Sequence, residues 1–243
     1  MIKGIYTSAS AMVPRLKKQE LVANNLANAS TPGYKKDRLF VQELTKAEKR
    51  LRPQQSDWQE PMINQIYTSF APGVFDRTGN PLNMAIDGDG FFQVELADGT
   101  RALTRNGAFS VSPEGLLEIP GGAYLIGEGG TIEVGAGKVE VSGTGIVTSD
   151  GQNVGRIVPV TVENIDSLQK VGGSLFIVPE GTEMTPVTTA NIQQGFLEAS
   201  NVDIVKEMIE MIISFRNYEA DSKAIKTQDD SLEQLFNRVG SSR

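Results

Sequence analysis

The chain has 243 residues, a net charge of −7, and neither cysteine nor histidine. This composition excludes disulfide scaffolds, Cys/His zinc sites and any nucleophilic mechanism that uses histidine as its base. No stretch approaches the roughly 20 apolar residues of a membrane span, and no basic region followed by an apolar one predicts a cleaved signal peptide. We therefore expect no membrane insertion.

Charge is distributed unevenly along the sequence. Residues 1–52 hold 11 Lys/Arg against 4 Asp/Glu, whereas the remainder holds 12 against 26. A basic arm beside an acidic body favours docking on a neighbour of the same kind over nucleic acid, because the body repels phosphate. We expect no nucleic-acid partner; a solvated basic face is the remaining alternative.

The first predicted element is an N-terminal helix over residues 2–26. Its residues recur in steps of four and three, which places them on one stripe of a coiled-coil helix. The stripe is formed by Ile2, Ile5, Ala9, Met12, Leu16, Gln19, Ala23 and Leu26. Pro14 predicts either a kink or a helix that begins near it, and residues 30–33 stop the helix with proline and glycine. We assign residues 1–34 to an N-terminal helical assembly segment.

Three asparagines, Asn24, Asn25 and Asn28, lie near the end of this helix, although asparagine is a poor helix former. One interpretation is fraying before Pro32. The other is specific hydrogen bonding to a packed partner, as a buried asparagine fixes the register of a coiled coil. The second predicts an assembly interface that includes these asparagines together with Leu16 and Leu26.

Residues 35–72 are polar and predict an extended connector. Of 25 glycines, 22 fall between Gly73 and Gly195, and each would cost about 1 kcal/mol inside a helix. Residues 73–195 therefore predict an all-β, antiparallel, sandwich- or barrel-like domain. Its candidate strands are 91–96, 101–104, 108–111, 116–119, 131–134, 138–141, 145–148, 156–163 and 174–178.

The most enzyme-like string is Asp87-Gly88-Asp89-Gly90. It lacks the further oxygen ligands of a calcium loop and does not open a helix as a dinucleotide fingerprint does, so a tight turn before a strand is the better interpretation. Other carboxylates are scattered, and no spacing selects an acid/base pair among them. We expect no catalytic residue, cofactor or metal.

The last predicted element is a heptad helix that follows residue 200, within a C-terminal segment 196–243. Its seam is Ile204, Met208, Met211, Phe215, Tyr218, Ser222, Ile225, Asp229, Leu232, Phe236 and Val239, of which only Ser222 and Asp229 are polar. An apolar side chain stabilises by roughly 1.5–3 kcal/mol only when it leaves water, so both terminal helices need partners. The predicted fold class is α+β, with long N- and C-terminal helices pairing as a coiled-coil-like core beside the β domain. The predicted assembly interface at this end is Ile204, Met208, Met211, Phe215, Tyr218, Ile225, Leu232 and Phe236.

Several strings together resemble bacterial flagellar axial proteins, and most closely the basal-body rod family. They are residues 23–35 (ANNLANASTPGYK), 78–94 (TGNPLNMAIDGDGFFQV), 103–109 (LTRNGAF), 195–203 (GFLEASNVD), 216–220 (RNYEA) and 223–225 (KAI). Residues 125–132 and 154–157 look more like the proximal-rod (FlgF) type, whereas the 35–72 connector also suits the distal-rod (FlgG) type. We favour the proximal type. Pro14 departs from the family's usual uninterrupted first helix.

The resemblance implies a structural protein without catalytic activity. It implies export through the flagellar export apparatus without a cleaved signal peptide, and packing of terminal helices with other copies and neighbouring rod or hook subunits. The product would be the periplasm-spanning rod of the basal body, which carries torque from motor to hook. The alternatives are a distal-rod or hook-type axial subunit and, in another class, a secreted β-rich wall-polysaccharide enzyme or binding module on a coiled-coil stalk. The enzyme alternative predicts a concave site with converging carboxylates.

Overall fold

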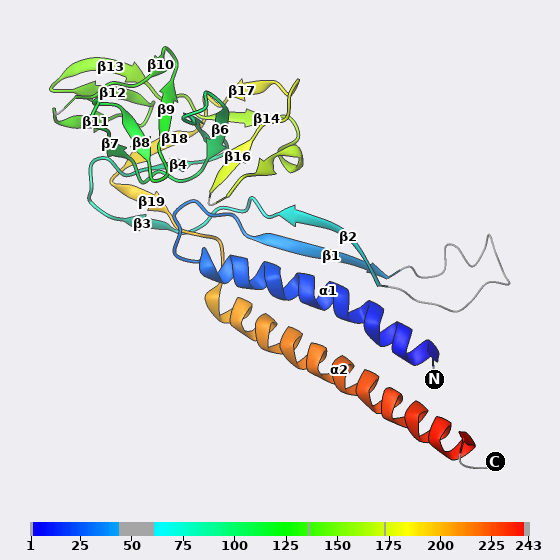
Figure 1. Cartoon of the computed structure of the whole chain (residues 1–243). Coiled ribbons are helices and arrows are strands. Elements are labelled where there is room, and N and C mark those ends of the chain that lie inside the picture. The colour runs from blue at the N-terminus through cyan, green and yellow to red at the C-terminus, as the bar shows by residue number, and fades with distance from the viewer. Residues whose placement is uncertain (1, 44–60, 136, 173, 241–243) are drawn as a thin grey trace. The chain divides into compact units, whose positions relative to one another are not determined.

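The computed structural model describes residues 2–43, 61–135, 137–172 and 174–240. Contacts divide the chain into two compact units, each built from segments far apart in sequence (Figure 1). The helical unit takes its residues from 1–27, 37–69 and 203–243, and the β unit from 28–36 and 70–202. The chain therefore passes between the two units more than once.

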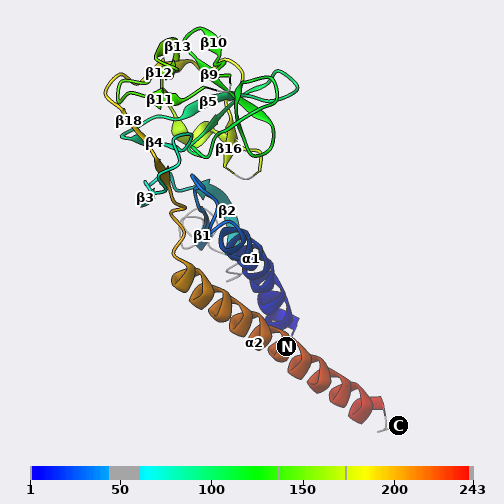
Figure 2. The ribbon, with the colours of Figure 1, turned by 90° about the vertical axis from the view of Figure 1, so that its left-hand side faces the viewer.

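The helical unit contains two long helices that lie side by side, α1 (Ile2–Ala27) and α2 (Ile204–Gly240), as both views show (Figures 1 and 2). They run antiparallel, because Asn25 near the end of α1 contacts Glu207 near the start of α2. Strands β1 (Asp37–Glu43) and β2 (Pro61–Thr68) pair antiparallel and contact α1. Helix α1 thus lies between this strand pair and α2 (Figure 1).

Helix α1 begins at Ile2 and continues through Pro14, so the expectation of a helix that begins near Pro14 is wrong. The proline ring lacks the N–H that would close one helical hydrogen bond. Its side chain is buried, and this burial offsets part of the loss.

Helix α2 begins at Ile204 because Asp203 caps it. The Asp203 Oδ1 accepts a hydrogen bond from the Lys206 N–H at 3.1 Å, and the Glu207 N–H donates to the Asp203 carbonyl at 2.9 Å. A side chain that accepts from the first-turn amides is the usual N-cap arrangement. The C-terminal segment 196–243 therefore starts with a strand and becomes helical only after this cap.

The β unit is built around one antiparallel sheet in the order β15-β16-β6-β5-β9-β8-β7, with β10 paired to β9. Its strands are β5 (Phe92–Glu95), β6 (Arg101–Thr104), β7 (Ser110–Val111), β8 (Leu117–Ile119), β9 (Ala123–Gly127), β10 (Gly130–Thr131), β15 (Gln169–Lys170) and β16 (Leu175–Ile177).

Smaller antiparallel sheets complete the β unit: β11-β12-β13, β14-β17, β18-β4 and β19-β3. Their strands are β3 (Phe75–Arg77), β4 (Met84–Asp87), β11 (Val139–Val141), β12 (Ile146–Ser149), β13 (Gln152–Arg156), β14 (Val160–Val162), β17 (Met184–Pro186), β18 (Asn191–Gln194) and β19 (Phe196–Glu198). A short 3-10 turn, η2 (Ile165–Ser167), precedes β15.

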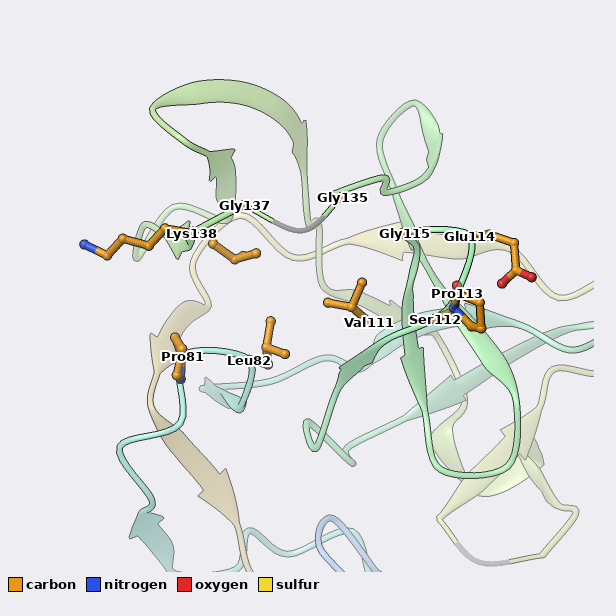
Figure 3. A pocket seen from close by; sticks show the side chains of 11 residues that line it. Pro81, Leu82, Val111, Ser112, Pro113, Glu114, Gly115, Gly135, Gly137 and Lys138 are labelled. Atoms are coloured by element: carbon orange, nitrogen blue, oxygen red, sulfur yellow. The ribbon is translucent and has the colours of Figure 1, made fainter.

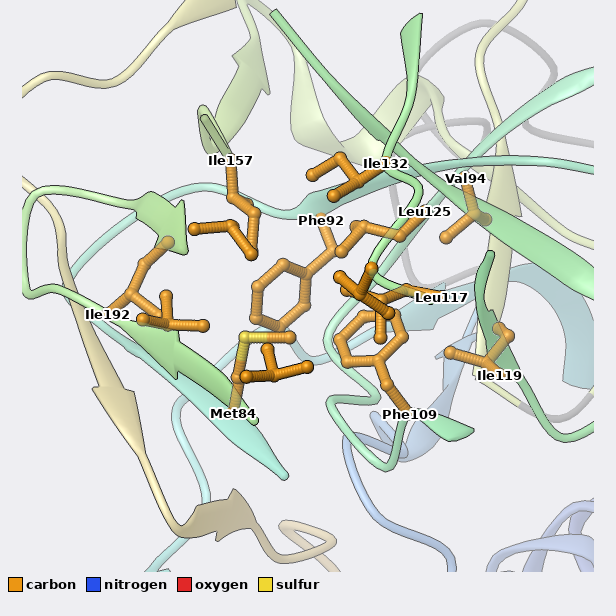
Figure 4. Packing of buried hydrophobic residues seen from close by; sticks show 14 of the residues in the cluster. Met84, Phe92, Val94, Phe109, Leu117, Ile119, Leu125, Ile132, Ile157 and Ile192 are labelled. Atoms are coloured by element: carbon orange, nitrogen blue, oxygen red, sulfur yellow. The ribbon is translucent and has the colours of Figure 1, made fainter. Parts of the chain in front are cut away.

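Two consecutive phenylalanines fill two hydrophobic clusters in the β unit. Phe92 lies in the larger cluster with Leu117 and Leu125 (Figure 4), and its ring meets the Phe109 ring edge-on at 5.3 Å. Phe91 lies in the second cluster, 6.0 Å from the Phe176 ring. Because neighbouring side chains of an extended chain point to opposite faces, one Phe-Phe pair serves both clusters.

The β-rich middle and the two terminal helices confirm the α+β class. Strands β1 and β2 both fall inside residues 35–72, where the sequence predicts an extended connector. In the part of the chain that the structure describes, neither helix combines the length and hydropathy of a membrane span.

The cap of α2 generates a pH prediction. Hydrogen bonds from Lys206 lower the pKa of Asp203, so the stabilisation by the carboxylate is present above the unfolded pKa of about 3.9 and disappears as pH falls through the folded value. Once Asp203 is protonated, we expect the amides of Lys206 and Glu207 to exchange faster relative to their intrinsic exchange rates at the same pH. In Asp203→Asn, which keeps a capping oxygen but cannot titrate, this acid response should vanish. NMR exchange rates of the two variants between pH 2 and pH 6 make the measurement, and an identical acid response in both would contradict the prediction.

Candidate functional site

The first turns of α2 carry an apolar surface that the helical unit leaves uncovered. Seven large apolar side chains in these turns are 43–66% exposed: Ile204, Val205, Met208, Ile209, Ile212, Ile213 and Phe215. At about 100° per residue they cover an arc of roughly 180° of the helix. We call this set the outward face of α2. Isolated exposed apolar residues are ordinary, but a continuous patch of this kind marks an interaction surface.

The opposite side of α2, which packs on α1, carries a polar row at intervals of seven. The row consists of Glu207, Ser214, Asp221 and Gln228. Ser214 donates to the Arg15 carbonyl at 3.1 Å, and the Arg15 guanidinium lies 2.5 Å from the Asp221 carboxylate and 2.6 Å from the Asn217 carbonyl. Lys18 and Glu210 form a further ion pair between the two helices. The pairing of α1 with α2 thus combines polar contacts with the half-buried Met211, Tyr218 and Ile225, while the outward face of α2 points away from α1.

Asn25 is the buried residue among the three predicted asparagines. Its side chain accepts from the Asp37 N–H and donates to the Asp37 carbonyl, both at 3.0 Å. It also donates to the Glu207 carboxylate at 3.3 Å. One carboxamide therefore joins the end of α1, the start of β1 and the start of α2.

The other predicted interface residues divide between exposed and half-buried positions. Leu16, Asn24, Ile204, Met208, Phe215 and Phe236 are exposed, whereas Leu26, Asn28, Met211, Tyr218, Ile225 and Leu232 are half-buried. Met211, Tyr218, Ile225 and Leu232 share the side of α2 that packs on α1. The Asn28 carbonyl accepts from the Thr31 N–H in the turn after α1.

A second feature, inside the β unit, is a buried cluster of three charges that we call the ionic junction: Lys35, Arg105 and Glu198. The Lys35 Nζ lies 2.5 Å from one Glu198 carboxylate oxygen, and the Arg105 Nη1 lies 3.3 Å from the other. Lys35 and Glu198 are at most 1% exposed, and Arg105 is 9% exposed. A single carboxylate is therefore shared by two cations that are largely out of contact with water.

Backbone groups complete the coordination of these charges. Lys35 also donates to the Ala71 carbonyl at 2.9 Å, and Glu198 accepts from the Gly73 N–H at 2.9 Å. Arg105 donates to the carbonyls of Ile86 at 3.1 Å and Gly88 at 2.8 Å. The Asp87-Gly88-Asp89-Gly90 string thus forms the bend between β4 and β5, and its backbone holds a guanidinium.

Close backbone contacts tie the segments around the junction together. The Gly33 N–H donates to the Glu198 carbonyl at 2.7 Å, and the Asn201 N–H donates to the Tyr34 carbonyl at 3.3 Å. Gly33 has a φ of +67°, and a Cβ there would lie 2.3 Å from the Arg105 backbone. Only glycine fits this position, which explains the turn that carries Lys35 to Glu198.

Burial sets the electrostatics of the junction. Desolvation lowers the pKa of Lys35, and the charge and hydrogen bond of Glu198 oppose that effect. Desolvation likewise lowers the pKa of Arg105, again opposed by Glu198. Glu198 thus opposes the effect of burial on the pKa of both cations, and the charge of Asp89 adds to that opposition at Arg105.

Two surface pockets of the β unit test the enzyme alternative. The first, of about 580 Å³, has one carboxylate and one ammonium in its lining, from Glu114 and Lys138, and both side chains point away from its interior (Figure 3). The second, of about 810 Å³, has Glu128 as the one carboxylate in its lining, with Arg101 and Arg156. Neither pocket offers the paired carboxylates of glycoside hydrolysis. No group of three or more potential metal ligands occurs among the residues that the structure describes.

Models of three protein families match successive parts of the chain. "Flagella basal body rod protein" matches residues 5–35, "Flagellar hook protein FlgE/F/G D1 domain" matches 85–155, and "Flagellar basal body rod FlgEFG protein C-terminal" matches 193–238. The flagellar basal-body rod protein FlgF of Caulobacter vibrioides is 35% identical over 99% of this chain and 99% of its own length. The chain belongs to the flagellar basal-body rod proteins of the FlgF/FlgG type.

Two further relatives cover nearly the whole chain. The Escherichia coli rod protein FlgF is 32% identical over 95% of this chain and 96% of its own length. The Bacillus subtilis rod protein FlgG is 30% identical over 98% of this chain and 99% of its own length. As a member of this family the chain is a structural component of the flagellar basal body and not an enzyme, and the wall-polysaccharide alternative is unsupported.

In this rod protein, the three family matches meet at the ionic junction. Lys35 falls in the first match, Arg105 in the second and Glu198 in the third. Sequence reasoning missed all three as site residues, although each lies in a string that carries the resemblance. The sequence signal for the junction was a charged residue inside an otherwise apolar or glycine-rich string. This signal does not single out Lys35, because the adjacent Lys36 is also charged.

The junction predicts a large loss of stability on removing one charge. Glu198→Gln keeps the side-chain shape but removes the carboxylate that Lys35 and Arg105 share, so the free energy of unfolding of the β unit should fall by about 3–5 kcal/mol. The matched control is Glu140→Gln, because Glu140 pairs with Lys138 at 2.7 Å where both side chains are more than half exposed. That control should leave stability nearly unchanged, because solvent screens an exposed ion pair. Urea unfolding followed by near-UV circular dichroism compares them, and equal stabilities would refute the role of Glu198.

Proposed function

We propose that this protein is a subunit of the flagellar rod that assembles through its terminal helices, with copies of itself and with neighbouring rod and hook subunits, into the drive shaft that carries torque from motor to hook. The observation that carries the proposal is the outward face of α2. A helix pair that needed only itself would bury its apolar side and expose its polar one. Here the polar row of α2 lies on α1, and the outward face is left for a neighbour.

The free energy of apolar burial, compared with the cost of association, favours several neighbours over a single partner. Full burial of a large apolar side chain contributes roughly 1.5–3 kcal/mol, so covering the exposed half of each of the seven contributes on the order of 7 kcal/mol in total. Bringing two molecules together costs about 4–15 kcal/mol. One contact through the outward face is therefore near break-even. A tube, in which each subunit touches several others, makes the same surface sufficient.

The predicted interface residues have two roles in this proposal. Leu16, Asn24, Ile204, Met208, Phe215 and Phe236 contact neighbouring subunits. Asn25, Leu26, Asn28, Met211, Tyr218, Ile225 and Leu232 act from inside the subunit by holding the terminal helices in register. In the assembled rod these helices would form the coiled-coil-like inner core.

In this proposal, each segment of the chain has its own role in the assembled rod. Residues 1–34 and 196–243 serve assembly, 35–72 connect, and 73–195 form the outer β domain. A sandwich- or barrel-like closure of that domain stays a prediction, supported by its many short antiparallel strands and its large shared core. Export through the flagellar export apparatus, without a cleaved signal peptide, is part of the proposal and would deliver the subunit to the periplasm-spanning rod.

Position within the rod is the finer part of the proposal, and we favour the proximal, FlgF-type position. The 35% identity to the Caulobacter vibrioides FlgF, against 30% to the Bacillus subtilis FlgG, supports it. Quantitative mass spectrometry of purified hook–basal bodies provides the test. A low copy number, severalfold below that of the most abundant rod subunit, is expected; an equal or higher number would move the chain to the distal rod, and its absence would overturn the rod assignment.

Charge placed on the outward face should prevent assembly without unfolding the subunit. Ile209→Asp/Ile212→Asp puts two carboxylates where apolar contact is proposed, so association should weaken at least a hundredfold. The control, Ala220→Asp, adds a carboxylate at an exposed position of the same helix beyond the outward face. Sedimentation velocity over a concentration series and swimming of a complemented deletion strain report the effect. Normal swimming with the double variant would contradict the proposal.

A further inference from the structure

The pocket of about 810 Å³ in the β unit has a size that suits a small organic ligand. Its walls come from the β9–β10 turn, from the chain between β13 and β14 and from the chain between β17 and β18, strands that Figure 1 labels. Segments far apart in the sequence therefore line one concave space, and all of its lining residues belong to the β unit.

The buried part of this lining is aliphatic. Ile126, Ile157, Val160 and Ile192 are each at most 7% exposed, and we call these four residues the floor of the pocket. Among the residues that the structure describes, no aromatic side chain lines the pocket, so a flat ring has no face on which to stack. The floor therefore favours a ligand with an aliphatic body.

The floor also discriminates between ligands by their hydrogen bonding. A peptide brings one N–H and one C=O with almost every residue, and each of these groups costs free energy when it is buried without a partner. Isoleucine and valine side chains supply no such partner. An acyl chain needs none, so the floor suits an acyl chain better than a peptide.

Two arginines line the pocket with donors that its own residues do not use. The Arg156 Nε donates to the Thr144 carbonyl at 3.3 Å, whereas its Nη1 lies 3.9 Å from the Glu128 carboxylate, too far for a hydrogen bond. The Arg101 guanidinium makes no hydrogen bond or ion pair with the residues that the structure describes. A guanidinium presents its N–H groups as a fork that matches a carboxylate. With two cations against one carboxylate, the pocket favours an anionic group.

The charge of the whole β unit limits how much negative charge a ligand can carry. Residues 28–36 and 70–202 contain 16 Asp/Glu against 8 Lys/Arg. A long polyanion would extend over this acidic surface and be repelled by it. A ligand with a single carboxylate confines its charge to the two arginines.

We infer that this pocket binds an aliphatic carboxylate of the fatty-acid type, with its acyl chain on the floor and its carboxylate between Arg101 and Arg156. The charge of the arginines matches the carboxylate, and the aliphatic floor matches the chain. This binding function goes beyond the proposed assembly and does not depend on it, so the failure of either leaves the other in place.

A chain-length series tests both halves of the inference on the full-length, unmodified protein. NMR titration with sodium butyrate, hexanoate and octanoate measures affinity, and the amide signals of Ile126 and Ile157 locate the site. Affinity should rise roughly fourfold with each CH₂ that leaves water on the floor. Octanol, which has the same chain but no charge, should bind at least tenfold more weakly than octanoate. Equal binding of octanol and octanoate, or no saturable binding of octanoate at these amides, would overturn the inference.

A pair of charge variants tests the role of the arginines. Arg101→Gln/Arg156→Gln should weaken octanoate binding at least tenfold and leave octanol binding unchanged. The matched control, Arg77→Gln/Lys138→Gln, removes two exposed cations of the same unit that do not line this pocket. An equal loss in the control would assign the effect to overall charge and contradict the inference. Tighter binding of an acetylated aliphatic tripeptide with a free carboxylate would also contradict it, because the ligand class would then be a peptide terminus.

Discussion

The Glu198 carboxylate is the constraint on which the β unit depends. Two cations from distant parts of the chain, Lys35 and Arg105, lose their hydration around it, and a cation left unpaired in such a place costs several kcal/mol. Well-packed apolar residues would often serve stability as well as an ion cluster does. What the charges add is selectivity, because Lys35 and Arg105 accept only a carboxylate at this point. The cluster therefore joins Lys35, near one end of the β unit in sequence, to Glu198, near the other.

The same cluster organises the places where the chain changes units. Residues 33–36, 71–73 and 198–201 all belong to the β unit, and each adjoins a segment of the helical unit. The Lys35 ammonium and the side-chain amide of Asn201 both donate to the Ala71 carbonyl, each at 2.9 Å. These hydrogen bonds join the three segments.

The fold class and several strands could be predicted from the sequence, whereas the shortest strands and the ionic junction could not. Residues 101–104 were predicted as the strand that they form, because a flanking Asp-Gly turn marks the start of β6. Short strands such as β18 and β19 were missed, because two to four residues carry too little pattern and gain their partners from distant segments. The junction was missed for the same reason: which of two adjacent lysines, Lys35 or Lys36, becomes buried depends on a glutamate some 160 residues away.

The heptads of α2 illustrate a different limit. The pattern predicts a seam, and Met211, Tyr218 and Ile225 of that seam do lie toward α1. Ile204, Met208 and Phe215 of the seam face outward, and polar residues such as Glu207 and Ser214 share the side toward α1. Periodicity reports that a helix side is apolar, but it does not report whether the partner is the same chain or another. Only the structure separates the two, because it shows which side is already occupied.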